Sequence, residues 1–276
     1  MPITGGSVPI ERALLPCHFG EWIQGRLGAD GPVALVSLLP SRVHVHARWQ
    51  PGQGVRCHAI GHGDLDRARI ARFARALGGL PQGRVALRLP YPPGLGTGMS
   101  TAGLMALAAF AGRAIPPWAL ARACVAAEGA SDPLMLPEAS RLLWASRQGR
   151  VMAKLPPQPR ADLLAGFFGP SRPTRGHDQA YDDVSDLVAL WQQDKGLAAC
   201  AALASESARR CLARRGPPDD PTDALARDLG ALGWAMSHSG AARALIFAPG
   251  ELPRHGAERL REAGLRGVHV LATPRP

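Results

Sequence analysis

The segment from Pro90 to Ala109 places the strongest constraint on how this chain folds and what it binds. It begins Pro-Tyr-Pro-Pro-Gly-Leu-Gly-Thr-Gly-Met-Ser-Thr-Ala-Gly-Leu-Met. Residues 84–89 before it alternate polar and apolar side chains, which predicts a strand, and residues 100–113 are rich in Ala, Leu and Met, which predicts a helix. A glycine-rich turn between a strand and a helix start lets backbone N–H groups approach an anion closely, and the helix dipole favours negative charge. The segment therefore predicts a phosphate-binding loop.

Two hydroxyl residues, Ser100 and Thr101, stand at the expected start of the helix. They can cap the helix or ligate a Mg²⁺ ion bound to phosphates, and a tight turn with a Ser/Thr cap is the plainer interpretation. A Walker A loop is excluded, because it needs Gly-Lys-Ser/Thr and neither of the two lysines lies in this segment. A dinucleotide-binding Gly-x-Gly-x-x-Gly loop is excluded as well, because Met99 stands at the third glycine position.

The remaining pattern is Pro-x-Gly-Leu-Gly followed by small residues and Ser-Thr-Ala. It resembles the ATP-binding loop of the GHMP kinases, which include galactokinase and the homoserine, mevalonate and phosphomevalonate kinases. The resemblance implies that ATP binds here, with its phosphates held by the helix dipole and the backbone N–H groups of residues 96–99. The residues that it assigns to the nucleotide are Pro93, Gly94, Leu95, Gly96, Thr97, Gly98, Met99, Ser100 and Thr101.

A second motif lies near the N-terminus, where residues 16–25 read Pro-Cys-His-Phe-Gly-Glu-Trp-Ile-Gln-Gly. An acid after a glycine, followed by Gln and a second glycine, is typical of a functional turn, although a hairpin alone also accounts for it. The motif resembles one GHMP branch, the L-threonine kinases of cobalamin biosynthesis, which carry Pro-x-x-x-Gly-Glu-x-x-Gln-Gly before a Val-Ser strand. In the wider superfamily this segment lies beside the phosphoryl acceptor, so the resemblance makes Glu21 and Gln24 acceptor-site candidates.

Two carboxylates, Glu128 and Asp132, flank a turn of small residues. Such a pair can hold Mg²⁺ and take up a hydroxyl proton, and a helix end followed by an Asp cap accounts for the same residues. The threonine branch carries a Glu and an Asp at this point. The resemblance implies that Ser100 and Glu128 hold Mg²⁺, and that Asp132 orients or deprotonates the acceptor hydroxyl.

Two later segments extend the resemblance. The sequence His238-Ser239-Gly240 matches the closing His-Ser/Thr-Gly motif of the threonine branch, and the Gly-Ala-Gly-Gly-Gly run of mevalonate and galactose kinases is absent. The segment around Asp178 resembles the Val-Asp-Thr segment of that branch, although a solvated loop acid is the plainer interpretation. Glu21 and Asp178 are therefore candidates for binding the ammonium of an amino-acid acceptor. His238, Ser239 and the N–H groups around Gly240 are candidates for its carboxylate.

The resemblance spans nearly the whole chain and implies an α+β fold with the two domains of the GHMP kinases. We expect an N-terminal ATP-binding domain over residues 1–155, similar to domain 2 of ribosomal protein S5. We expect a ferredoxin-like C-terminal domain over residues 156–276, because a proline cluster at residues 156–159 marks a boundary. Within the first domain, residues 50–63 predict a loop and residues 138–148 predict a helix.

The composition is that of an ordinary globular protein, with 276 residues of which 46% are hydrophobic and 20% charged. The net charge of +10 comes almost entirely from scattered arginines, which favours an anionic substrate such as ATP. Without a recognised motif or an arginine block, we expect no nucleic-acid partner. The five cysteines include no Cys-x-x-Cys pair, which predicts neither a disulfide framework nor a zinc site. We see no signal peptide and no apolar run of membrane-spanning length, so we expect a cytoplasmic protein without a membrane partner.

The motifs in order predict an ATP- and Mg²⁺-dependent kinase that phosphorylates the side-chain hydroxyl of L-threonine to O-phospho-L-threonine for cobalamin biosynthesis. One alternative is a kinase of another hydroxylated metabolite, such as homoserine. The other is a non-catalytic nucleotide-binding regulator, because Met99 replaces a serine of the family loop and Glu128 lies one residue farther from Asp132 than in the branch pattern. Whether the protein forms a homodimer is left open.

Overall fold

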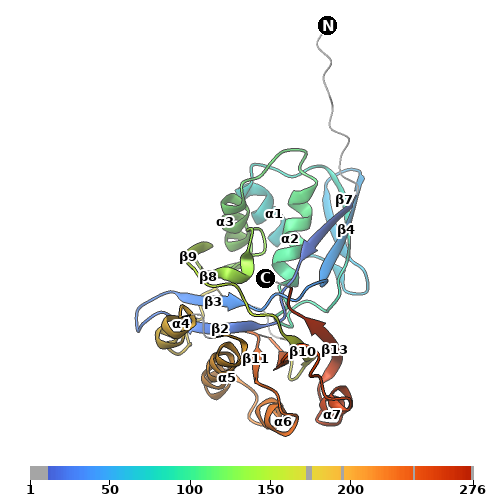
Figure 1. The fold of residues 1–276 in the computed structure, drawn as a ribbon. Coiled ribbons are helices and arrows are strands. Elements are labelled where there is room, and N and C mark those ends of the chain that lie inside the picture. The colour runs from blue at the N-terminus through green and yellow to red at the C-terminus, as the bar shows by residue number, and fades with distance from the viewer. Residues whose placement is uncertain (1–11, 172–175, 194–195, 239, 275–276) are drawn as a thin grey trace.

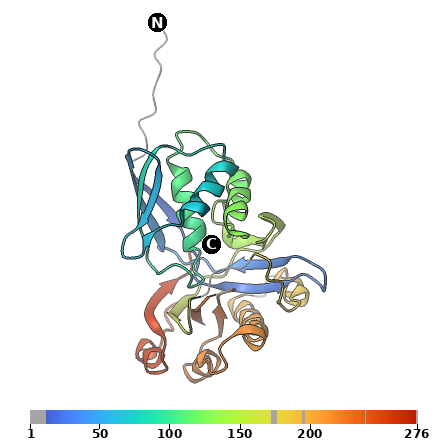
Figure 2. The same cartoon turned by 180° about the vertical axis from the view of Figure 1, so that it is seen from behind.

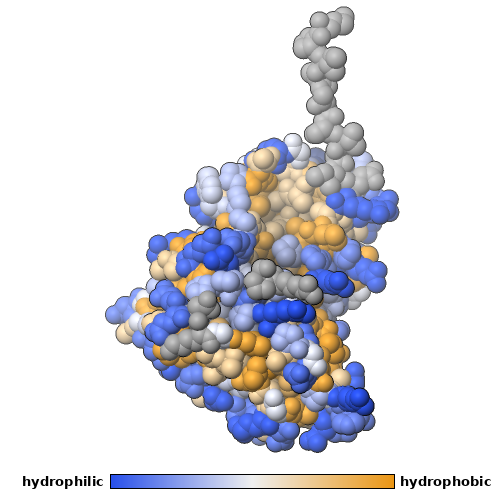
Figure 3. Space-filling model, in the orientation of Figure 1, coloured by the Kyte–Doolittle hydropathy of each residue, from blue (hydrophilic) through white to orange (hydrophobic). Residues whose placement is uncertain are grey.

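The computed structural model describes residues 12–171, 176–193, 196–238 and 240–274. These residues contain two β-sheets. The first sheet has the strand order β1-β4-β7-β5-β6, and the second has the order β13-β10-β12-β11-β2-β3-β8-β9. Helices α1, α2 and α3 and the first sheet lie on one side of the second sheet, and α4 to α7 lie on its other side (Figures 1 and 2). Hydrophilic residues cover much of the lower rim, where α6 and α7 face solvent (Figure 3).

The first sheet consists of β1 (Arg12–Pro16), β4 (His44–Pro51), β7 (Gly83–Arg88), β5 (Val55–Ala59) and β6 (Gly63–Asp64). The loop expected over residues 50–63 is wrong, because the end of β4, the whole of β5 and the start of β6 fall within it. β5 pairs in parallel with β7, whereas β1, β4 and β6 pair antiparallel with their neighbours. Cys57 and Ala59 are buried and alternate with the polar residues Arg56 and His58, but this short alternation lies among glycines and prolines that indicate a loop.

The second sheet consists of β13 (Arg266–Ala272), β10 (Asp162–Phe167), β12 (Ala242–Phe247), β11 (Gly233–Met236), β2 (Glu21–Arg26), β3 (Val33–Ser37), β8 (Leu142–Ala145) and β9 (Arg150–Lys154). The helix expected over residues 138–148 is wrong, because a 3-10 turn at Ala139–Arg141 leads directly into β8. β8 pairs with β3 on one side and β9 on the other, and all four of its side chains are buried. Pairing on both edges outweighs the helix propensity of this segment.

The helices are α1 (Arg67–Ala76), α2 (Met99–Ala109), α3 (Pro117–Glu128), α4 (Ser185–Trp191), α5 (Gly196–Arg215), α6 (Thr222–Asp228) and α7 (Gly256–Glu262). Helix α1 begins at Asp66, whose carboxylate accepts the backbone N–H groups of Ala68 and Arg69. Helix α2 is buried along most of its length, in agreement with a sequence that is apolar or small at almost every position. The helix following the glycine-rich loop is therefore part of the core, which holds the loop in place.

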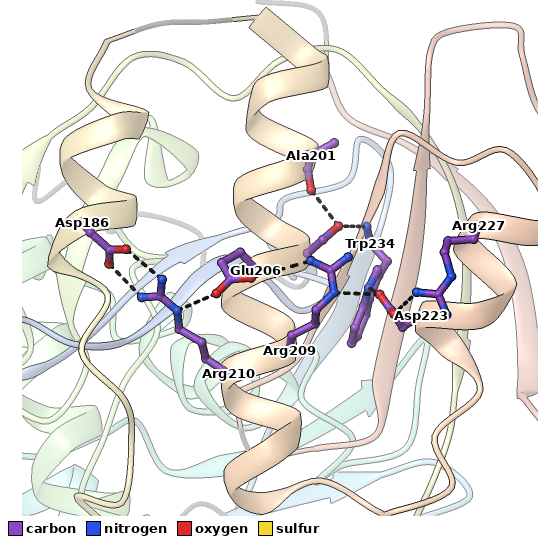
Figure 4. Close-up of polar contacts among 9 residues, drawn as sticks. Asp186, Ala201, Glu206, Arg209, Arg210, Asp223, Arg227 and Trp234 are labelled. Carbon is purple, nitrogen blue, oxygen red and sulfur yellow. Dashed lines mark hydrogen bonds and ion pairs between the residues drawn. The ribbon is translucent and has the colours of Figure 1, made fainter.

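Helix α5 is attached to its neighbours by polar contacts (Figure 4). Arg210 forms two hydrogen bonds of 2.8 Å with the carboxylate of Asp186 on α4. Arg209 donates to Asp223 on α6 at 3.0 Å, and the same carboxylate accepts the indole N–H of Trp234 on β11 at 2.7 Å. These contacts attach α4 and α6 to α5, and α6 to β11 of the second sheet.

The second sheet contains strands from both sides of the proline cluster at residues 156–159. β2 pairs with β11 at Glu21 and Met236, and the side-chain amide of Gln24 donates to the carbonyl of Met236 at 2.9 Å. The division into two domains at residue 155 stays a prediction. Within the described ranges, no helix combines the length and hydrophobicity that crossing a bilayer requires.

Candidate active site

A cavity of about 680 Å³ lies between the glycine-rich loop, the C-terminal end of α3 and the start of β2. Its wall brings together residues from four of the sequence motifs. Those relevant to chemistry are His18, Glu21, Arg69, Arg72, Pro93, Gly94, Gly96, Thr97, Gly98, Met99, Ser100, Thr101, Glu128, Asp132, Arg147 and His238. The loop, the N-terminal motif, the acidic turn and the closing motif thus meet at one place.

The loop has the backbone conformation that an anion site needs. Gly94, Gly96 and Gly98 have φ angles of +80°, +79° and +70°, which favour glycine. Gly98 is the N-cap of α2, and the first N–H groups of a helix have no partner within it. The hydroxyl of Thr97 is buried and has no hydrogen-bond partner among the described residues. An unpartnered buried hydroxyl beside free N–H groups suits phosphate oxygens.

Ser100 and Glu128 converge on one cation, the guanidinium of Arg69. The Ser100 hydroxyl donates to the Glu128 carboxylate. Arg69 Nη1 lies 2.7 Å from Ser100 Oγ and 2.6 Å from Glu128 Oε1. Burial raises the pKa of Glu128, and Ser100 and Arg69 oppose that effect. A carboxylate and a hydroxyl oxygen directed at one positive charge are ligands of the kind Mg²⁺ takes, so these residues fit a magnesium ion in place of Arg69.

His18 lies between the carboxylates of Glu21 and Asp132 on the cavity wall. Its Nδ1 is 3.5 Å from Glu21 Oε1, and its Nε2 is 3.5 Å from Asp132 Oδ2. Burial alone would lower the pKa of His18, but Asp132 and Glu21 outweigh it and raise the pKa to about 9. Burial also tends to raise the pKa of Asp132, yet the charge of His18 holds it below its ordinary value. Burial raises the pKa of Glu21 to about 7.

The three ligand atoms of His18, Glu21 and Asp132 lie within 4.8 Å of one another, a geometry that can also hold a metal ion. An imidazole must lose its proton to ligate a metal, and Asp132 and Glu21 raise the pKa of this one to about 9, which favours the ion pair over a metal ion. We therefore interpret the cluster as an ion-paired triad that fixes the Asp132 carboxylate at the cavity wall.

His238 contacts both the triad, through Glu21, and the basic side chain of Arg147. Its backbone N–H donates to Glu21 Oε2 at 2.9 Å. Burial, assisted by the charges of Arg147 and Arg215, lowers its pKa well below the ordinary value, so the ring is neutral. Arg147 Nη2 lies 3.1 Å from His238 Nε2, which accepts the hydrogen bond, and the ring of Tyr181 stacks on the imidazole with centroids 4.3 Å apart.

Other predicted acceptor residues do not line this cavity. Asp178 forms a 2.6 Å ion pair with Arg215, whose guanidinium lies over the ring of Tyr181. Gln24 is a buried residue of β2, and its side-chain amide donates to the carbonyl of Met236 on β11. Ser239 lies outside the described residues. The structure therefore gives Asp178 and Gln24 partners within the protein, and their assignment to the acceptor stays a prediction.

Two other predicted residues support the loop from behind. Leu95 is buried, and its carbonyl accepts the N–H of Ala242 at 2.9 Å. Gly240 packs so closely on Leu95 and Gly96 that a methyl group there would overlap their backbone. The closing motif thus holds the nucleotide loop as well as facing the cavity through His238.

Sequence reasoning missed His18, Arg69 and Arg147. His18 stands three residues before Glu21 in a quoted motif, so its position was a usable signal. Nothing in the sequence distinguishes Arg69 from the other arginines of its helix. Arg147 belongs to a segment that we expected to be helical. The partners of these two arginines are distant in sequence, and only the fold brings them together.

No protein-family model matches the sequence, and no curated protein does. Solved structures do match. The mevalonate kinase of Methanococcus jannaschii aligns with a TM-score of 0.64 and 9% identity over 99% of this chain and 100% of that one. The homoserine kinase of Cytophaga hutchinsonii aligns with a TM-score of 0.59 and 16% identity over 97% and 96%. A 4-(cytidine 5'-diphospho)-2C-methyl-D-erythritol kinase aligns with a TM-score of 0.56 and 20% identity over 95% and 98%.

These likenesses show that the chain has the mixed α and β fold of small-molecule kinases over almost its full length. The fold expected from the GHMP resemblance is confirmed at that level.

Proposed function

We propose that the chain is an ATP-dependent kinase of a small hydroxylated metabolite, and that its acceptor is L-threonine, giving O-phospho-L-threonine for cobalamin biosynthesis. One observation carries the proposal: a single cavity joins the glycine-rich loop to the triad of His18, Glu21 and Asp132. Phosphoryl transfer depends mainly on positioning and charge neutralisation, and this cavity offers groups for both reactants. The branch motifs support threonine as the acceptor.

The loop side suits the nucleotide. The N–H groups at the start of α2 and the Thr97 hydroxyl bind the phosphates, and Arg72 adds positive charge to the same wall. Ser100 and Glu128 hold Mg²⁺, which when bound neutralises negative charge on the phosphates. The Met99 side chain supplies no hydroxyl, so Ser100 is the serine of this loop that can reach the ion.

The triad side suits the acceptor. Asp132 is unprotonated at neutral pH, because His18 holds its pKa low, and it accepts a hydrogen bond from the acceptor hydroxyl. A carboxylate with a low pKa is a weak base, so it takes the proton late, as the hydroxyl oxygen bonds to the γ-phosphorus and ADP leaves. His18 keeps the carboxylate oriented throughout.

A second candidate acceptor is homoserine, which the likeness to a homoserine kinase supports. Homoserine carries the same ammonium and carboxylate as threonine, but its hydroxyl is primary and reached through a longer chain. A single measurement on the purified chain with MgATP separates the candidates, namely ADP release with phosphorus NMR of the products. The acceptors are L-threonine, L-homoserine, L-serine, mevalonate and galactose.

We expect phosphorylation of threonine, weak phosphorylation of serine, and none of mevalonate or galactose. Mevalonate lacks the ammonium and galactose lacks both charged groups, and a site built for specific polar partners rejects analogues that lack them. Faster phosphorylation of homoserine than of threonine would make homoserine the acceptor. ATP binding without phosphoryl transfer to any acceptor would favour the alternative that the protein is a non-catalytic regulator.

Two variants test the assigned roles. Asp132→Asn should lower turnover by roughly 10²–10⁴-fold, as loss of a general base does, while a fluorescent ATP analogue still binds. Ser100→Ala should lower turnover by about 10²-fold or more. If Ser100→Ala turns over like the wild type and Thr97→Ala is inactive, our assignment of hydroxyl roles in the loop is wrong.

A further inference from the structure

Among the residues that the structure describes, Arg147 is a cation on the cavity wall without an acidic partner. It follows β8 directly, and no carboxylate lies within ion-pair distance of it in the described part of the chain. Its hydrogen bond there is to the neutral His238 ring, and its Nε is buried without an acceptor. A guanidinium has five N–H donors in a fork that matches a carboxylate, so Arg147 retains most of its binding capacity.

The carboxylates that surround Arg147 are engaged elsewhere. Asp132 and Glu21 share the imidazolium of His18, and Glu21 also accepts the N–H of His238. Asp178 is paired with Arg215 at 2.6 Å. A partly buried cation without a counter-charge is costly, so the structure leaves one negative charge to be supplied by a ligand.

Arg147 stands on the acceptor side of the cavity. The backbone N–H of Ser131 donates to the carbonyl of Ser146 at 2.9 Å, which sets Asp132 and Arg147 next to one another along the wall. Trp144 strengthens this junction, because its indole N–H donates to the carbonyl of Ser131 at 2.7 Å. The nucleotide side has a different cation, Arg69, bound to Ser100 and Glu128.

The guanidinium also has a rigid support. Its partner His238 stacks almost parallel on Tyr181, with an interplanar angle of 7°. Arg215 covers the other side of the Tyr181 ring at 4.2 Å and is itself held by Asp178. The segment around Asp178, which the sequence placed at the acceptor, thus reaches the cavity indirectly through this stack.

We propose that Arg147 binds the carboxylate of the acceptor, and that the enzyme is therefore specific for hydroxy acids rather than neutral alcohols. The inference rests on the proposed kinase function and names the chemical class of its acceptor. It also moves the carboxylate subsite from the Ser239–Gly240 turn to the end of β8.

The test compares L-threonine with L-threoninamide and L-threoninol, which keep the hydroxyl and the amine but lack the carboxylate. We expect the wild type to prefer threonine by about 100-fold in kcat/KM, as sites built for a specific polar partner do. Arg147→Gln should raise the KM for threonine by roughly 50-fold and reduce the preference over threoninamide to a few-fold, with the KM for ATP unchanged. Arg147→Lys, which keeps the charge but loses the fork, should be intermediate.

Arg150→Gln is the matched control, because Arg150 is an exposed arginine three residues farther along that does not line the cavity. It should behave like the wild type, and thermal denaturation should show that every variant is folded. The inference is wrong if Arg147→Gln keeps the preference for threonine, or if it raises the KM for ATP instead, since Arg147 would then bind a nucleotide phosphate.

Two further outcomes separate this inference from the proposed function. If the wild type phosphorylates threoninol as well as threonine, the kinase assignment stands and the carboxylate subsite is wrong. If no acceptor is phosphorylated, calorimetric binding of threonine in the presence of a non-hydrolysable ATP analogue still tests Arg147. Binding that is lost in Arg147→Gln and kept in Arg150→Gln supports the subsite, and equal binding by both, or none by the wild type, overturns it.

Discussion

His18 shows how a residue with an ordinary intrinsic pKa acquires a fixed charge through its neighbours. The fold buries its imidazole between Glu21 and Asp132, 3.5 Å from each. Desolvation opposes the charge, and two nearby carboxylates restore it. A buried imidazolium of this kind keeps Asp132 ionised and in place, so the chemistry assigned to Asp132 depends on a residue that does not itself need to touch the acceptor.

The pH dependence of stability tests that pairing. The folded-state pKa of His18 is raised to about 9, so its contribution is complete below the unfolded value and is lost as the pH rises through 9. We expect the free energy of unfolding of the wild type to fall by about 2 kcal/mol between pH 6.5 and 9 relative to His18→Gln. Urea denaturation at several pH values measures it.

His62→Gln is the control for this series, because His62 is an exposed histidine away from the cavity. Its curve should run parallel to that of the wild type. A His18→Gln curve that also runs parallel would mean that His18 is neutral in the folded protein, and the triad as we describe it would be wrong.

Sequence motifs identified the hydroxyl and acidic residues of the site more readily than the basic ones. Ser100, Glu128 and Asp132 were assigned from motifs, and the structure places all three on one cavity wall. Arg69 and Arg147 carry no such local signal, because the partner that gives an arginine its role lies tens of residues away. In a chain with this many arginines, only the three-dimensional neighbours distinguish one from another.

At the scale of elements, the sequence predicted those whose pattern is local. The strand–loop–helix unit from β7 to α2 and the proline-started helix α3 formed as expected. β5 and β8 were missed for a common reason. Each is short and gains its stability from neighbouring strands, so its own residues indicate a loop or a helix.

The contact between the closing motif and the nucleotide loop gives a prediction at this scale. A methyl group at Gly240 would overlap the backbone of Leu95 and Gly96. We expect Gly240→Ala to displace the loop and weaken binding of a fluorescent ATP analogue by about tenfold or more, since backbone atoms cannot yield as a side chain does. Titration of the analogue measures this.

Gly52→Ala is the matched control, because the nearest atom to a methyl group there is at an ordinary contact distance of 3.8 Å. It should bind the analogue as the wild type does. Unchanged binding by folded Gly240→Ala would show that the turn does not hold the loop.

At the scale of the molecule, the second sheet crosses the expected domain boundary. Strands from both halves share it, and β2 meets β11 beside the cavity. We expect both halves to unfold in one transition, because separating them would expose paired strands and buried cores. Trp144 and Trp234, both buried and one in each half, are suitable reporters.

The measurement uses urea denaturation of two variants, each of which keeps one of these tryptophans as the fluorescent reporter and has the other five tryptophans of the chain replaced by phenylalanine. Loss of helix followed by circular dichroism serves as the internal control in each variant. Midpoints from fluorescence and circular dichroism should coincide within each variant. A separate fluorescence transition for one half would contradict a shared cooperative unit.

The pairing of β2 with β11 also has a consequence for how the protein is made. Glu21 and His238, which are hydrogen-bonded at the cavity, are 217 positions apart in the chain. Contacts between such distant positions form late, because a long loop must close first. During synthesis the nucleotide loop emerges early, while β2 keeps an open edge until the closing motif leaves the ribosome. A chain that stalls before residue 236 therefore has the groups for ATP but an unfinished acceptor side, with an exposed strand edge that other chains can pair with.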